Sequence, residues 1–134
     1  MDGNLNVVLS IGSNCGPRHD AVEEAMAWLS GLLDRFMASD IYETDAIGHE
    51  GPKYMNAVAS GVSSMTLEEL EACCKRYERE FGRDDLSRIE KRVPIDIDIV
   101  VADGRVLRPR DFNCEFFRRG YMELVTPQYL EALR

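Results

Sequence analysis

The sequence contains few of the residues that a zinc-binding or disulfide-bonded small domain needs. It has two histidines and four cysteines, and no two cysteines form a C-x-x-C pair. These counts argue against a zinc site, because such sites use four Cys or His ligands at short spacings. Cys73 and Cys74 are adjacent in a helical pattern, and we expect them to be reduced packing residues. Reduced thiols favour a cytoplasmic location.

The sequence also lacks long apolar segments and an excess of positive charge. No apolar run approaches the roughly 18 residues of a transmembrane helix, and the N-terminal segment does not resemble a signal peptide. The 24 acidic residues outnumber the 16 basic ones, which gives a formal net charge of −8. This charge argues against nucleic acid or a membrane as a partner. An anionic substrate such as a nucleotide would therefore need a metal ion or a local basic cluster.

The order of strand and helix patterns is typical of an α+β fold, and the 134 residues are expected to form one domain over 1–134. Apolar periodicity predicts strands at 6–11, 37–44 and 54–62 and helices at 18–36 and about 118–126. A capping box at Thr66 and Glu69 and a stop at Gly82 bound another helix. An Asp103-Gly104 turn joins a strand through Asp98 to one at 105–107. This order is β-α-β-β-α-β with an extra strand and a C-terminal helix. It predicts a ferredoxin-like, mainly antiparallel sheet, a pattern in which helices cover one face.

Two aspartates lie side by side in the segment R-V-P-I-D-I-D-I-V-V, which spans 92–101. Side chains alternate along a strand, so Asp96 and Asp98 share one face while the neighbouring isoleucines face a core. The paired carboxylates repel each other, and a Mg²⁺ ion with carboxylate and phosphate ligands would remove that repulsion. The alternative is an amphipathic strand whose solvent face is acidic.

Tyr54 and Asn56 also share one strand face, directly after a loop at 45–53 that is rich in glycine and proline. An aromatic ring beside an amide suits a flat heterocycle, which stacks on the ring and hydrogen-bonds to the amide. The alternative is a core tyrosine followed by an asparagine near the strand end. Ser13 and Asn14 end the first strand, and their simplest alternative role is to cap the next helix.

Basic residues gather near the aspartates, in or beside the long loop at 82–94. They are Arg83, Arg88, Lys91 and Arg92. Four cations there would suit a polyphosphate, and we expect the loop to close over it. The alternative is a solvated loop of mixed charge. Arg118 and Arg119 form a second basic pair, which could equally be an exposed helix start.

Together these segments resemble the hydroxymethyl-dihydropterin pyrophosphokinase family of folate biosynthesis. The resemblance covers nearly the whole chain, because five blocks occur in order with nearly the same spacing. The blocks are Ile11 to Asn14 (I-G-S-N), Tyr42 and Thr44 with Gly48 and then Tyr54 and Asn56, Glu78 with Arg83, Asp96-Ile97-Asp98, and Arg119-Gly120-Tyr121-Met122.

The resemblance implies a transfer of the β,γ-diphosphate of ATP to the hydroxymethyl oxygen of a dihydropterin, with release of AMP. It implies two Mg²⁺ ions held by Asp96 and Asp98, a pterin sandwiched by Tyr54 and Tyr121, and Asn56 at the pterin edge. The resemblance also implies Thr44 and Ile47 near the pterin, and Arg83 and Arg119 at the phosphates. We further expect Glu78, Arg88 and Arg92 at the nucleotide, with Arg83 and Arg92 catalytic. We expect a monomer or weak homodimer.

The chain departs from the family pattern in the phosphate clamp. Val93 stands where the family has an active-site arginine, and Asn113 stands where it has a histidine. Arg92 is the best substitute for the arginine, and Arg88 is the next. The departures leave a second hypothesis open: a catalytically weak relative that binds a nucleotide or pterin, or that serves as an interaction module.

Overall fold

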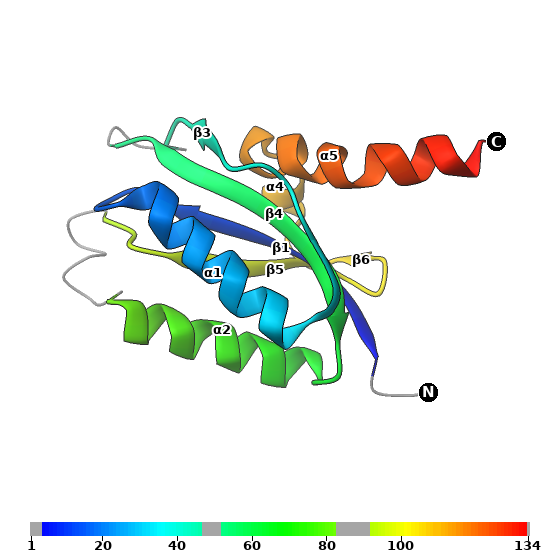
Figure 1. Cartoon of the computed structure of the whole chain (residues 1–134), viewed down its shortest axis with the longest axis horizontal. Coiled ribbons are helices and arrows are strands. Elements are labelled where there is room, and N and C mark those ends of the chain that lie inside the picture. Colours follow the sequence, from blue (N-terminus) through cyan, green and yellow to red (C-terminus); the bar gives the residue numbers. More distant parts are fainter. Residues whose placement is uncertain (1–3, 47–51, 83–91, 134) are drawn as a thin grey trace.

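The computed structural model describes residues 4–46, 52–82 and 92–133 (Figure 1). Its strands form one antiparallel sheet in the order β2-β4-β1-β5-β6, and β3 also pairs with β4. The strands are β1 (Leu5–Ser13), β2 (Asp34–Ala38), β3 (Tyr42–Thr44), β4 (Tyr54–Ser63), β5 (Asp96–Ala102) and β6 (Arg105–Val106). The order β2-β4-β1-β5 is that of a ferredoxin-like sheet, so the predicted fold class is confirmed.

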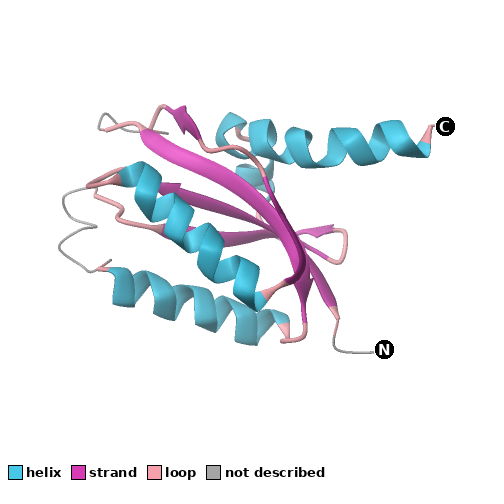
Figure 2. Cartoon of the chain, viewed as in Figure 1, coloured by secondary structure: helices cyan, strands magenta, loops and turns pink. Residues whose placement is uncertain are grey.

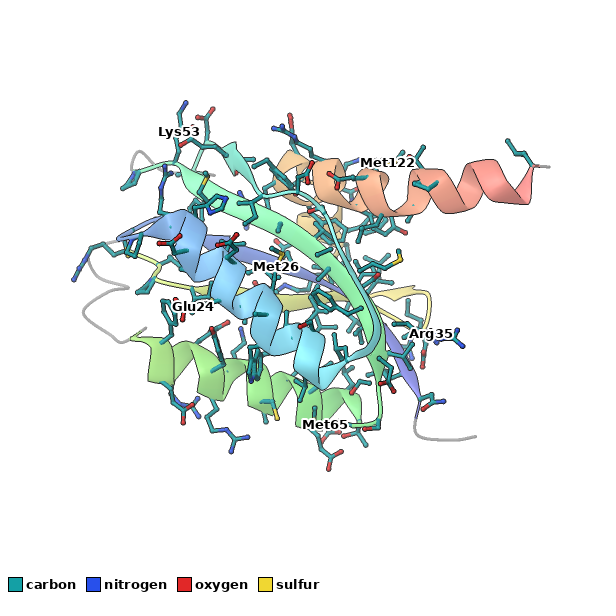
Figure 3. All side chains as sticks on the ribbon, viewed as in Figure 1. Glu24, Met26, Arg35, Lys53, Met65 and Met122 are labelled. Carbon is teal, nitrogen blue, oxygen red and sulfur yellow. The ribbon has the colours of Figure 1, made fainter. Side chains whose placement is uncertain are left out.

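Helices α1 (Arg18–Leu32) and α2 (Leu67–Phe81) cover one face of the sheet, which we call the α1/α2 face. Alternate residues of the central strands point into this layer and are almost fully buried, among them Leu9, Ile11 and Ile97. Met26 of α1, labelled in Figure 3, packs against the same core. The expected core face of the aspartate strand is therefore confirmed, because Ile95, Ile97 and Ile99 are all buried.

The opposite face, which we call the α4/α5 face, carries helices α4 (Pro109–Phe112) and α5 (Glu115–Ala132). Val58 and Val100 of the sheet pack there with Phe117 and Leu124 of α5. The C-terminal helix, which the sequence predicts as an addition to the ferredoxin-like pattern, therefore covers the face that α1 and α2 leave open. Helix α5 extends past the sheet in Figure 1, and Met122, labelled in Figure 3, is 48% exposed.

The predicted helix stop and turn signals are confirmed where the structure describes them. Thr66 accepts a hydrogen bond from Glu69 N, and the Glu69 carboxylate accepts one from Thr66 N, which closes the capping box. Gly82 ends α2 with φ 120°. Asp103 and Gly104 have φ values of 48° and 77°, which form the tight turn between β5 and β6.

Several element boundaries differ from the sequence prediction; Figure 2 shows the helices and strands as they are in the structure. The first helix ends at Leu32 instead of residue 36, and the predicted strand at 37–44 is two strands, β2 and β3. Leu33 and Phe36 fit both a helical stripe and a strand, and Leu33 packs in extended conformation against Gly61. Helix α5 begins before residue 118 and continues through Pro127, which is exposed. In the described part of the chain, no helix is both long and apolar enough to cross a membrane.

Candidate active site

A pocket of about 160 Å³ lies on the α4/α5 face, where β1, β4 and β5 carry polar side chains. The strand register places Asn56 of β4 beside Gly12 of β1, and Gly12 beside Asp96 of β5. The pocket is lined by Ser10, Ile11, Gly12, Thr44, Asp45, Tyr54, Asn56, Asp96 and Phe116. The pocket therefore joins the predicted heterocycle-binding pair, Tyr54 and Asn56, to one of the predicted metal ligands.

Asn56 is held in place at the wall of this pocket. It is only 5% exposed, and its amide nitrogen donates a hydrogen bond to Thr44 Oγ1. Its Oδ1 would lie only 2.9 Å from a Cβ added to Gly12, so any larger residue at position 12 would displace the Asn56 side chain. Because Thr44 takes a donor of the amide, the Asn56 oxygen is the atom suited to accept an N–H from a ligand.

The two aspartates point to the same face of β5, as predicted, and cations surround them. Lys75 Nζ of α2 lies 3.2 Å from Asp98 Oδ1 and 3.9 Å from Asp96 Oδ1. Arg108 Nη1 lies 3.9 Å from Asp98 Oδ1. The carboxylates of Asp96 and Asp98 offer oxygen ligands of the kind that Mg²⁺ prefers. Phosphate and water would supply its other ligands.

The charges at this site shift one another's pKa values. Burial alone would raise the pKa of Asp98, but hydrogen bonding to Asp96 and the charges of Lys75 and Arg108 outweigh it and lower that pKa. Burial would lower the pKa of Lys75, but Asp98 and Glu78 outweigh it and raise that pKa. Asp98 is therefore ionised and Lys75 is protonated at neutral pH.

Glu78 fastens the edge of β5 to α2. It is 4% exposed, and its Oε2 accepts hydrogen bonds from Ile97 N at 2.7 Å and Lys75 Nζ at 2.9 Å. Lys75 Nζ also donates to Ile97 O at 3.2 Å. Side chains of α2 thus bond the outward-facing backbone groups of Ile97, which lies between the two aspartates. The predicted nucleotide role of Glu78 stays a prediction.

Comparison with known proteins assigns the family. The chain matches the model of the 7,8-dihydro-6-hydroxymethylpterin-pyrophosphokinase family over residues 8–128. The chain belongs to this family. A 2-amino-4-hydroxy-6-hydroxymethyldihydropteridine pyrophosphokinase of Porphyromonas gingivalis is 35% identical over 99 residues, which cover 71% of this chain and 67% of the relative. An Aquifex aeolicus protein with the same name is 32% identical over 105 residues, covering 78% of this chain and 65% of the relative.

The chain is also similar to a part of longer proteins. A "folate synthesis bifunctional protein" of Chlamydia trachomatis is 38% identical over 101 residues, which cover 70% of this chain and 22% of that protein. The same kind of domain therefore occurs as a small part of larger folate synthesis proteins.

The I-G-S-N block of the family resemblance has a structural role at the entrance to β5. Asn14 is 1% exposed, and its Oδ1 accepts a hydrogen bond from Val93 N, while Asn14 N donates to Val93 O at 2.9 Å. The alternative that Asn14 caps the next helix is wrong, because Pro17 is the N-cap of α1 and makes no side-chain cap bond. Asn14 instead fixes the segment that leads to Asp96.

The C-terminal block is placed differently from what the resemblance implies. Phe117, Gly120 and Leu124 form the buried stripe of α5, and Tyr121 stacks on Phe117 with ring centroids 5.3 Å apart. Tyr121 lines a separate cavity with Leu124 and Val125, and the structure does not bring it to Tyr54. Phe116 is the α5 aromatic residue that lines the pocket of Tyr54.

Arg119 and Gly120 hold α5 against β3. The guanidinium of Arg119 lies 4.8 Å from the centre of the Tyr42 ring, and Arg119 lines a cleft next to the pocket together with Thr44 and Phe116. A Cβ on Gly120 would lie 2.8 Å from the Tyr42 hydroxyl and 2.7 Å from Val58, so only glycine allows this close approach. Arg119 therefore lies near the part of the pocket that Thr44 and Phe116 line.

Several predicted residues cannot be placed. Ile47, Arg83, Arg88 and Lys91 lie outside the described residues, and Arg92 is exposed at the beginning of a described range. Sequence reasoning missed Lys75, Arg108 and Phe116. Lys75 could have been found from its i, i+3 spacing to Glu78, which puts both side chains on one face of the helix.

Proposed function

We propose that this chain transfers the diphosphate group of ATP to the hydroxymethyl oxygen of 6-hydroxymethyl-7,8-dihydropterin and releases AMP. Membership of a pyrophosphokinase family, and relatives named for pyrophosphokinase activity and folate synthesis, support the reaction class. In this reaction the hydroxymethyl oxygen forms a bond to Pβ of ATP, the bond from Pβ to the oxygen bridging to Pα breaks, and the hydroxyl proton is lost.

The pterin would occupy the pocket lined by Tyr54, Asn56 and Phe116. Its flat ring would contact the two aromatic side chains, and Asn56 Oδ1 would accept an N–H from its edge. Thr44 would orient Asn56, as it does through the hydrogen bond between them. Ile47 and Tyr121 are the further pterin contacts that the family resemblance implies, and Tyr121 would need to move from its stack on Phe117 to take part.

The nucleotide would bind beside the aspartates. Asp96 and Asp98 would hold two Mg²⁺ ions, which would neutralise the phosphate charge and polarise the phosphorus under attack. Lys75 and Arg108 already balance the charge of Asp98 and would lie close to phosphates bound there through a metal ion. The other proposed nucleotide contacts are Glu78, Arg83, Arg88, Arg92 and Arg119, of which Arg83 and Arg92 would act on the reacting phosphates.

One observation carries the proposal: Asp96 lines the same pocket as Tyr54 and Asn56. A pterin held by Asn56 would therefore have its substituent next to a metal-binding carboxylate. This is the arrangement that transfer of a metal-bound diphosphate requires, because positioning and charge neutralisation supply most of the rate in phosphoryl transfer.

The test is incubation of the protein with ATP, Mg²⁺ and 6-hydroxymethyl-7,8-dihydropterin, with nucleotides separated by chromatography. We expect AMP and the pterin diphosphate in equal amounts, and neither product without Mg²⁺. Formation of ADP, or of no product under conditions where pterin binding is measured by calorimetry, would overturn the proposal. Pterin or nucleotide binding without AMP would instead support the catalytically weak binding module, which the altered residues Val93 and Asn113 favour.

We also propose that residues 1–134 act as one domain, as a monomer or weak homodimer in the cytoplasm, with no nucleic acid or membrane partner. The net charge of −8 supports the last point, because it opposes binding to polyanions.

A further inference from the structure

The ammonium group of Lys75 lies among three carboxylates at the edge of β5. Its Nζ is 2.9 Å from Glu78 Oε2, 3.2 Å from Asp98 Oδ1 and 3.9 Å from Asp96 Oδ1. It also donates to the carbonyl oxygen of Ile97 at 3.2 Å. An ammonium has three N–H donors, and Glu78, Asp98 and Ile97 accept them. A positive charge bound only by oxygen atoms thus already lies at the aspartate pair.

Other cations nearby are held differently. Arg108 is 3.9 Å from Asp98, but its Nε donates to Asp111 at 2.7 Å, so its shortest ion pair is with Asp111. Arg76 follows Lys75 on α2 and is exposed, and its guanidinium contacts Cys73 Sγ at 3.6 Å. Lys75 is therefore the described cation most closely centred on the two aspartates and Glu78.

We propose that Lys75 is an internal counter-ion of the Asp96–Asp98 pair, which competes with free divalent cations for these carboxylates and thereby makes metal binding depend on the nucleotide. The inference rests on the proposed function, because it takes Asp96 and Asp98 as the metal ligands. A divalent ion on Asp98 either displaces the ammonium from its acceptors or binds close to a like charge, and both cost free energy.

A nucleotide changes this balance. The triphosphate of ATP carries about four negative charges at neutral pH, so a metal–nucleotide complex brings anionic oxygen atoms with the metal. These oxygens can accept hydrogen bonds from the displaced Lys75 ammonium and offset its charge. Lys75 would therefore weaken the binding of a free metal ion much more than the binding of a metal–nucleotide complex. It also lets the two aspartates lie together in the metal-free protein.

The experiment measures Mn²⁺ binding, by calorimetry or by the electron spin resonance signal of free Mn²⁺, in the absence of nucleotide. Lys75→Gln removes the charge and keeps a hydrogen-bond donor, and Arg76→Gln removes the same charge one residue away as the matched control. We expect Lys75→Gln to bind Mn²⁺ about three- to tenfold more tightly than wild type, given a half-exposed site. The control should differ by less than about twofold. The difference in Mn²⁺ affinity between Lys75→Gln and wild type should become smaller when α,β-methylene-ATP is present. That result would support the proposal that the nucleotide offsets the charge of Lys75.

Unchanged or weaker Mn²⁺ binding by Lys75→Gln would overturn the inference while leaving the proposed function intact, provided that Asp98→Asn abolishes Mn²⁺ binding. If wild type binds no Mn²⁺ at this site even with the ATP analogue, the metal assignment itself fails. Melting temperatures in EDTA establish that each variant is folded. If Lys75→Gln does not fold, Lys75→Met, which keeps the apolar stem, takes its place with the same expected outcome.

Discussion

The two faces of the sheet are built from the same strands but differ in burial and in polarity. On the α1/α2 face, strand residues such as Leu9 and Ile97 are almost completely buried under two helices. On the α4/α5 face, the equivalent positions change character along each strand. Val58 and Val100 pack under α5, whereas Asn56 and Asp96 line the pocket. One face is thus devoted to stability, and the other is shared between packing and chemistry.

The alternation of side chains makes this division of labour possible. Ile97 fills the core between Asp96 and Asp98, so the apolar residue that anchors the strand also fixes the direction of both carboxylates. A change on the apolar face should therefore reduce stability without altering binding, and a change on the pocket face should do the reverse. The predictions below test this separation, from the largest expected effect to the smallest.

Asp98→Asn should give the largest effect, and on activity alone. Loss of a carboxylate that binds the metal should reduce AMP formation by on the order of 10³-fold or more, or about 4 kcal/mol of transition-state free energy. The free energy of unfolding should change by less than about 1 kcal/mol, because asparagine has nearly the same volume and Lys75 keeps Glu78 as a partner.

Initial rates of AMP formation and urea unfolding measure the two quantities for Asp98→Asn. Asp34→Asn, which changes an exposed acid on β2, is the control and should match wild type in both. Retention of wild-type activity by Asp98→Asn would show that the metal assignment is wrong.

Leu9→Ala should give the reverse pattern. Leu9 is 0% exposed on the α1/α2 face, and its truncation should lower the free energy of unfolding by about 3 kcal/mol. Pterin affinity, measured on the folded fraction, should stay within about twofold of wild type, because Leu9 points away from the pocket. Val106→Ala, at a 40% exposed position, should cost less than about 0.5 kcal/mol. A large loss of pterin affinity in folded Leu9→Ala would break the separation of the two faces.

The stable face was also the easier one to predict from sequence. The isoleucines at 95, 97 and 99 and the stripe of α2 are local periodic patterns, and the capping box at Thr66 is a local signal. The same local period placed Asp96 and Asp98 on one face. The C-terminal end of α1 was harder to predict, because Leu33 fits a helix and a strand equally well and its contact with Gly61 decides between them.

The parts of the site that sequence reasoning missed depend on contacts between distant segments. Lys75 and Asp98 are 23 positions apart and meet only because α2 packs along the edge of β5. Phe116 lines the pocket, and Tyr121 does not, because α5 starts earlier than predicted and its buried stripe runs through Phe117 and Leu124. A motif gives the identity of such residues, but the register of the helix on the sheet decides which side chain lines the pocket.

Asn56→Ala should act on the ligand more than on the fold. Removing the amide would leave an N–H of the bound pterin without its acceptor and should weaken pterin binding by about 1–3 kcal/mol. Calorimetric titration of pterin measures this loss. Ser60→Ala is the matched control on the same strand, because Ser60 lines a different cavity and should leave pterin affinity unchanged. Equal affinity in Asn56→Ala and wild type would place the pterin elsewhere.

Tyr42→Phe should give the smallest effect, at the point where packing and chemistry meet on the α4/α5 face. The Tyr42 hydroxyl accepts a hydrogen bond from Gly120 N at 3.1 Å and donates one to the carbonyl oxygen of Phe116, which lines the pocket. Losing the hydroxyl should lower the free energy of unfolding by about 1 kcal/mol at neutral pH. Tyr121→Phe, which keeps the ring stacked on Phe117, should be close to wild type.

The effect of Tyr42→Phe should also depend on pH in one direction. Burial, partly offset by the hydrogen bond from Gly120 and the charge of Arg119, raises the pKa of Tyr42 to about 12 from an ordinary value of 10.0. A raised pKa means that the stability due to the neutral phenol is fully present below pH 10 and is lost as the pH rises toward 12. Urea unfolding at pH 8 and pH 11 should therefore show the gap between wild type and Tyr42→Phe narrowing at the higher pH. A gap that is constant or wider at pH 11 would contradict the raised pKa of Tyr42, and with it the burial of the phenol between α5 and the sheet.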